Sequence, residues 1–288
     1  MQHRLSHSLV LSIFMFLVAC SGAPPTSPGE KYLADARKGL KASDFNAALK
    51  DLDGAIRSAG DEPLGQQAAV LRVALVTALA DSSKQMAEAY GLGAKEPAAQ
   101  SHYGGFNKMR SDYYGMARSR LMDAMQSVMD RRRKLGGNPI PIEVNFPGFT
   151  GGTNLTVTKI KSGQWVTDAD RLGAELQVDR NALARTLSAL AGAGQDPDRG
   201  QQIFSSGKVD IDPRLYLVEL SDSFLQIGGI FGPRALNQPD HIRIVNEVVR
   251  GNLEVALKLL AAKPDKDLEA RAKKMQAECE KTLKKFGP

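Results

Sequence analysis

The sequence predicts a mostly α-helical protein made of antiparallel helical hairpins, with a small β-hairpin inserted between two helical regions. Three observations lead to this fold class. Apolar residues recur every three or four positions through most of the chain, which is the period of amphipathic helices. Glycine, proline, serine and asparagine interrupt this period where short turns between helices are expected. The stretch 140–160 instead carries two runs rich in β-branched residues.

The first 19 residues are predicted to be an export signal. Residues 1–8 are polar and include the positive charge of Arg4, and residues 9–19 are almost continuously apolar. An apolar run of this length forms a helix of only ~16 Å, about half of a ~30 Å hydrocarbon core. Such a segment engages an export channel but is too short for a lasting transmembrane helix.

The signal ends in Leu17-Val18-Ala19-Cys20. This sequence resembles the lipobox of bacterial lipoproteins, in which an aliphatic residue and two smaller ones precede the cysteine that receives the lipid. The resemblance implies cleavage before Cys20 and anchoring to a membrane through lipid on its thiol. The alternative is an ordinary secretory signal with a chance cysteine. In enterobacterial sorting an aspartate after the cysteine favours the inner membrane, so Ser21 indicates the outer membrane. Residues 20–30 are rich in proline, glycine and serine, and we expect a flexible lipidated tether.

Residues 31–137 are predicted to form a helical region that opens with a hairpin broken at Ser43-Asp44. The second helix of this hairpin has an aromatic, a small, a large apolar and a second small residue at helical spacing, namely Phe45, Ala48, Leu52 and Ala55. The pattern resembles the second helix of a tetratricopeptide repeat, where the small residue lies at a close crossing of the paired helices. The first helix matches less well, because Ala36 and Gly39 occupy positions that the family fills with glycine and an aromatic residue. An unrelated helical hairpin is the alternative.

Two longer helices are expected in the same region, over 63–92 and about 103–135. The second carries five methionines on or beside its apolar face, namely Met109, Met116, Met122, Met125 and Met129. A methionine-lined face can form an adaptable binding surface, and it can also be core that packs against a neighbouring helix. The cations at 131–134 lie in the last turn, where they complement the helix dipole.

Residues 138–166 are predicted to form the inserted β-hairpin. The first strand has alternating apolar residues at 140–146, a glycine-rich loop follows at 147–152, and a second β-prone run covers 155–160. A lone hairpin is marginally stable in water, so we expect it to pack on the helices with Trp165 as its anchor. The loop lacks the Walker lysine and the dinucleotide-binding spacing, which favours a hairpin tip over a phosphate site.

Residues 167–288 are predicted to form a second helical region. Thr167 and Asp170 have the spacing of a helix N-terminus. The stretch 172–187 resembles a DNA-binding helix-turn-helix in its apolar positions, with Gln177 in place of the usual turn glycine. An exported protein does not meet the chromosome, so we expect two short packed helices, the second capped by Asp179, and no nucleic-acid partner.

A second copy of the repeat pattern is predicted near the C-terminus. Residues 251–257 have the same order of small, Asn, apolar and alanine positions, so Leu253 and Ala256 correspond to Phe45 and Ala48. The two matches indicate a degenerate repeat family, although no period of about 34 residues connects them. An apolar helix over 213–230 precedes this motif. A charged helix over about 265–286, with Cys279 on its narrow apolar seam, follows it.

The chain lacks recognisable catalytic motifs. Its two histidines beyond the signal, His102 and His241, are far apart, and the patterns HExxH, CxxC and GxSxG do not occur. We therefore expect no enzymatic activity, no metal and no cofactor. The net charge of +6 is spread along the chain, as in a solvated surface.

Two classes of function fit these features. The first is a lipid-anchored scaffold or adaptor of the cell envelope that binds a protein or peptide partner through a helical-repeat face. The second is a periplasmic small-molecule carrier or transporter accessory lipoprotein with an apolar pocket. Tetratricopeptide lipoproteins that accompany binding-protein-dependent transporters are similar to this chain in the lipobox and the weak repeats alone. An open groove favours the first class and a closed apolar cavity favours the second.

Overall fold

A computed structural model describes residues 27–194 and 196–286. The predicted signal peptide and Cys20 lie outside these residues. Within them the α-helices are α1 (Pro28–Ala42), α2 (Phe45–Ala59), α3 (Pro63–Gly93), α4 (Tyr103–Arg131), α5 (Leu155–Lys161), α6 (Asp168–Leu190), α7 (Pro197–Ser206), α8 (Pro213–Gly228), α9 (Pro239–Ala262) and α10 (Lys266–Leu283). Short 3-10 helices cover Pro97–His102, Arg132–Lys134, Gly229–Phe231 and Lys284–Phe286, and the two strands are β1 (Ile140–Glu143) and β2 (Lys208–Ile211). The predicted fold class, mostly helical with a small antiparallel sheet, is confirmed.

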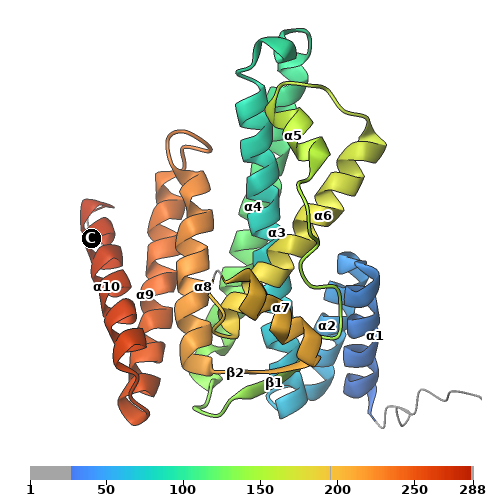
Figure 1. The fold of residues 1–288 in the computed structure, drawn as a ribbon. Coiled ribbons are helices and arrows are strands. Elements are labelled where there is room, and N and C mark those ends of the chain that lie inside the picture. Colours follow the sequence, from blue (N-terminus) through green and yellow to red (C-terminus); the bar gives the residue numbers. More distant parts are fainter. Residues whose placement is uncertain (1–26, 195, 287–288) are drawn as a thin grey trace, which may run out of the picture.

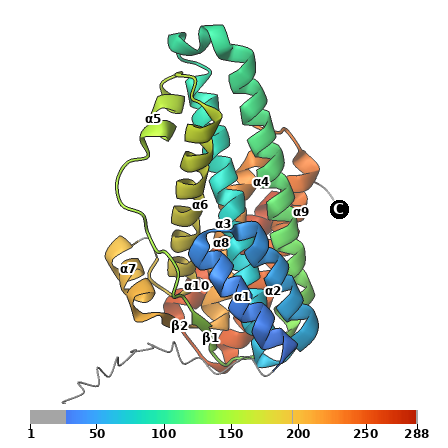
Figure 2. The ribbon, with the colours of Figure 1, turned by 90° about the vertical axis from the view of Figure 1, so that its right-hand side faces the viewer.

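Helices that follow one another in sequence pack as neighbours. The helices α1 to α4 pack in chain order, and α8, α9 and α10 form a second set beside them (Figure 1). Figure 2 shows α6 on one side of α3 and α4 on the other. The central helix α3 is long and apolar enough to cross a membrane, but 72% of its most apolar stretch is buried inside the fold. It therefore serves here as the core helix around which the others pack.

The N-terminal hairpin, α1–α2, breaks where the sequence predicts. Ser43 ends α1 in the left-handed conformation, with φ of 60°. The side chain of Asp44 then caps α2 by accepting a hydrogen bond from the backbone N–H of Ala47. The two helices approach closely where Gly39 faces Ala48, because a Cβ on Gly39 would lie 3.2 Å from the Cβ of Ala48. This is the close crossing expected from the repeat pattern, and its other motif residues, Phe45, Leu52 and Ala55, are buried as well.

The predicted tether over residues 20–30 is wrong at its C-terminal end. α1 begins at Pro28, after a reciprocal capping box between Ser27 and Glu30. Gly29 is buried, and a Cβ there would lie 3.1 Å from a methyl of Leu64. The Pro-Gly pair suggested flexibility, but proline is favoured in the first turn of a helix, where its missing N–H costs nothing.

The predicted β-hairpin over 138–166 is wrong in its second strand. β1 pairs antiparallel with the distant β2, with Ile140 opposite Ile211. The β-branched run 155–160 instead belongs to α5, which starts where the side chain of Asn154 accepts a hydrogen bond from the N–H of Val157 at 3.1 Å. α5 lies directly on the end of α3, since a Cβ on Gly93 would lie 2.0 Å from the carbonyl oxygen of Ile160. Local capping and packing on α3 thus override the β propensity of the run.

Trp165 anchors a different segment from the one predicted. Its ring stacks on His102 at 5.3 Å between centroids and meets Phe106 edge-on at 5.6 Å. A Cβ on Gly105 would lie 2.8 Å from the same indole. Trp165 therefore fastens the loop between α5 and α6 to the tip of the α3–α4 hairpin.

The two short helices expected over 172–187 are wrong, because α6 is a single continuous helix there. Its predicted start is confirmed, since the Thr167 side chain accepts a hydrogen bond from the backbone N–H of Asp170 at 3.1 Å. Asp179 does not cap a second helix. Its carboxylate instead accepts a hydrogen bond from the hydroxyl of Ser82 on α3. Asp179 therefore reflects a contact with α3 and not a turn.

The second repeat turn, expected at 251–252, is also wrong, because α9 runs without a break through this position. Arg132 donates hydrogen bonds to the carbonyl of Val248 at 2.9 Å and to the side-chain oxygen of Asn252 at 3.0 Å. A Cβ on Gly251 would lie 2.5 Å from that guanidinium. Gly251 therefore makes room for an arginine from the end of α4, and Asn252 accepts a hydrogen bond from it. Leu253 and Ala256 are fully buried, as core positions of a continuous helix.

The five methionines on or beside the apolar face of α4 are divided between the core and the surface. Met125 is buried, whereas Met116 and Met129 are 38% and 36% exposed. Cys279 on α10 is buried, as its place on the apolar seam predicts. Burial raises the pKa of its thiol to about 11.

Candidate functional site

A cleft of about 610 Å³ is lined mainly by residues of α3, α6 and α8. Its residues come from these three helices, from Arg271 on α10 and from two loop segments. The apolar part of its lining includes Phe149, Ala189 and Ile227. Most of the remaining lining is polar or charged, and the cleft opens to solvent between exposed side chains such as Arg185 and Gln226. A volume between about 300 and 1,000 Å³ is typical of ligand sites.

Thr77 on α3 lines this cleft and is 1% exposed. Its hydroxyl oxygen has no hydrogen-bond partner in the described part of the chain. Serines of the same helix behave differently, since Ser83 donates to the carbonyl of Leu79 at 2.8 Å. A buried polar group without a partner is destabilising, and Thr77 is among the residues that line the cleft.

Two ion pairs cross the walls of the cleft. Arg185 on α6 pairs with Asp81 on α3 at 3.3 Å, and Arg271 on α10 pairs with Glu219 on α8 at 2.8 Å. Glu219 is only 9% exposed, so its charge needs this partner. The hydrogen bond from Arg271 to Glu219 raises the pKa of the guanidinium. These pairs connect the helices that form the walls.

Two further carboxylates of the cleft form no ion pair among the described residues. Asp222 accepts a hydrogen bond from the side chain of Gln226 at 2.8 Å. Asp196 caps α7 by accepting from the backbone N–H groups of Asp198 and Arg199. The described residues contain no group of three or more metal-ligating side chains. The carboxylates of the cleft therefore do not form a metal-binding cluster among the described residues.

A polar network holds α6 against α3 and α4 beyond the cleft. Tyr113 donates its hydroxyl hydrogen to Glu175, which also accepts from Arg171 at 2.7 Å. Tyr113 stacks on Tyr90 at 5.7 Å between ring centroids. Burial raises the pKa of Tyr90 to about 12 and raises the pKa of Asp179, the residue that accepts from α3, above its ordinary value. The network fixes the helix whose next turns form one wall of the cleft.

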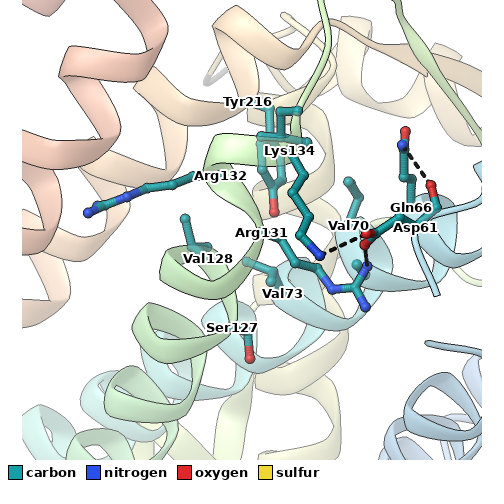
Figure 3. Close-up of a pocket in the computed structure, with 12 residues that line it drawn as sticks. Asp61, Gln66, Val70, Val73, Ser127, Val128, Arg131, Arg132, Lys134 and Tyr216 are labelled. Carbon is teal, nitrogen blue, oxygen red and sulfur yellow. Dashed lines mark hydrogen bonds and ion pairs between the residues drawn. The ribbon is translucent and has the colours of Figure 1, made fainter. Parts of the chain in front are cut away.

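A second hollow, between α3, the end of α4 and α8, is too small for a ligand at about 30 Å³ (Figure 3). That volume is far below the ~300–1,000 Å³ that is typical of ligand sites. The basic residues at its rim are already engaged, since Lys134 lies 2.7 Å and Arg131 lies 3.9 Å from the carboxylate of Asp61. These cations therefore bridge neighbouring helices in addition to their place at the end of α4.

The residues singled out from the sequence do not gather at the cleft. Four of them, Phe45, Ala48, Leu52 and Ala55, lie in α2, and Leu253 and Ala256 lie in α9. None of them is among the residues that line the cleft. The sequence carries a signal for this site, because Thr77, Glu219 and Asp222 interrupt otherwise apolar helices.

The chain matches no known protein family, and no curated protein or solved structure is significantly similar to it. Its function has to be inferred from the geometry and chemistry of this cleft.

Proposed function

We propose that the protein is a lipid-anchored adaptor of the cell envelope that binds a segment of a partner protein in the cleft between α3, α6 and α8. In this proposal lipid on Cys20 holds the chain to the outer membrane, and the folded domain presents the cleft to the partner. The lipobox resemblance supports the anchor. The recognition site lies outside the two repeat-like motifs.

The observation that carries the proposal is an open, charged cleft assembled from separate helices. An extended peptide offers backbone and side-chain groups that can pair with such a lining. A carrier of apolar small molecules would be expected to enclose its ligand in an apolar pocket. The spread of Asp81, Arg185, Glu219 and Arg271 around the cleft therefore favours the peptide over the carrier.

Site-specific photo-crosslinking in intact cells tests the partner. Thr186 lines the cleft, and Ser119 is an exposed residue of α4 that does not. With benzoylphenylalanine at each position in turn, we expect a protein adduct from position 186 and none from 119. Equal adducts from both positions, or none from either, would contradict the proposal. A small molecule extracted from the purified protein and bound in the cleft would instead support the carrier.

Fractionation of cells tests the anchor. The Cys20→Ala variant should leave the membrane pellet after a salt wash, whereas the parent chain should remain there. A variant that stays in the pellet would show that lipid on Cys20 is not what holds the protein to the membrane.

A further inference from the structure

The charge of the cleft is opposite to the charge of the chain. The whole sequence has a net charge of +6, whereas the cleft is lined by four carboxylates and two guanidinium groups. Both guanidinium groups are held in the ion pairs of Arg185 with Asp81 and of Arg271 with Glu219. The lining therefore has two negative charges that no cation of the described chain neutralises by direct contact.

These two charges belong to Asp196 and Asp222. Arg271 is near enough to Asp222 for the carboxylate to raise its pKa, but its hydrogen bond goes to Glu219. Lys84 contacts the carbonyl oxygen of Gln226 at 2.8 Å and pairs with Glu88 at 3.9 Å, so it does not neutralise Asp222 either. Carboxylates of this kind are available to a cation that enters from solvent.

The unpartnered hydroxyl of Thr77 lines the same cleft. A hydroxyl oxygen accepts a hydrogen bond from an ammonium or guanidinium group, and a carboxylate does so more strongly because the bond is charge-assisted. Each guanidinium group is already paired with a carboxylate, so an anionic ligand gains less from Arg185 or Arg271 than a cationic ligand gains from the two carboxylates without an ion pair. The observed pairing thus favours a cationic ligand.

We propose that the cleft recognises a basic side chain, lysine or arginine, in the bound segment, attracted by the unpaired carboxylates of Asp196 and Asp222 and with Thr77 as a neutral acceptor. This inference rests on the proposed function and adds the chemical class of the segment. The full lipidated chain in detergent micelles is titrated into three fluorescein-labelled pentapeptides, Gly-Ala-Lys-Ala-Gly and its glutamine and glutamate versions. Fluorescence anisotropy at low salt gives the three affinities.

We expect the lysine peptide to bind about tenfold or more tightly than the glutamine peptide, since a hydrogen bond to a charged group contributes at least that much. The advantage should shrink as salt is raised. Asp222→Asn and Asp196→Asn should each reduce it, and asparagine keeps the helix cap at position 196. Asp130→Asn is the matched control, because Asp130 is exposed on α4, accepts from a glutamine at 2.8 Å as Asp222 does, and lies outside the cleft.

Equal affinity for the three peptides, or equal effects of the variants at 130, 196 and 222, would overturn the cationic preference. The photo-crosslink at position 186 separates this failure from failure of the proposed function. A crosslink that persists while the peptides are not distinguished leaves a partner-binding cleft without a charge preference. If the crosslink at position 186 is absent and the peptides are not distinguished, the cleft is not a binding site.

Discussion

Replacing Gly251 with alanine should destabilise the fold, although alanine is the better helix former. Gly251 lies inside α9, where this change alone would stabilise the helix by about 1 kcal/mol. Here a Cβ would lie 2.5 to 2.7 Å from the guanidinium of Arg132 and displace it from Val248 and Asn252. Hydrogen bonds from a charged group contribute about 1.5–3 kcal/mol, and water can replace part of them because Arg132 is half-buried. The net expected loss is about 0.5–2 kcal/mol.

Thermal denaturation of a double-mutant cycle separates the two effects. At roughly 2–4 °C per kcal/mol for a domain of this size, Gly251→Ala should lower Tm by roughly 1–8 °C. In the Arg132→Ala background the clash is gone, and the same change should raise Tm by roughly 2–4 °C. Stabilisation in both backgrounds would refute the role given to Arg132. Destabilisation in both would mean that the backbone itself needs glycine, as the turn predicted from the sequence requires.

Three further changes test the packing and the buried titratable groups. Ala48→Leu should overpack the crossing with Gly39 and cost about 1–3 kcal/mol, whereas the exposed Ala270→Leu should change the urea midpoint by no more than about 0.5 kcal/mol. An equal midpoint for both would refute the close crossing. Because burial raises the pKa of Asp179 above 3.8, ionisation of the Asp179 carboxyl lowers the stability of the fold as pH rises through its folded-state pKa. Asp179→Asn should therefore raise Tm above that of the parent chain at pH 7, and this difference should disappear below about pH 3.8. A Tm difference that does not change with pH would contradict the burial of Asp179 as its cause. Cys279, with a pKa of about 11, should resist iodoacetamide at pH 8 until the chain unfolds, as peptide mass spectrometry would show; rapid labelling of the native protein would be inconsistent with its burial.

Features that depend on local chemistry could be predicted from the sequence. The apolar period located α2, α3 and α8, because a helix must bury one stripe wherever it packs. Asp44 located the start of α2, since a capping side chain contacts backbone groups within three residues. Thr167 located the start of α6 for the same reason. Each of these interactions is made between residues only a few positions apart in the sequence.

Features that depend on distant contacts could not be predicted. The partner of β1 is β2, and nothing in residues 140–143 specifies which later segment completes the ladder. The run 155–160 has strand propensity but folds as a helix on the end of α3. Gly251 and Asp179 resembled turn or cap residues, whereas each serves a side chain from another helix, Arg132 or Ser82. In the sequence alone, a glycine or aspartate that serves a distant side chain cannot be distinguished from one that forms a local turn or cap.

The cleft could not be predicted because its residues are spread over helices that only the fold brings together. One of these residues, Thr77, can be tested by a change that should raise stability and lower affinity at the same time. Thr77→Val removes a buried hydroxyl that has no partner, and such a group costs about 1–3 kcal/mol. The variant should therefore unfold at a higher temperature than the parent chain. It should also bind the lysine pentapeptide more weakly, because valine cannot accept a hydrogen bond. A hydroxyl that is merely a packing fault would give the first effect without the second, and a variant that melts lower would mean that the hydroxyl already has a partner in the free protein.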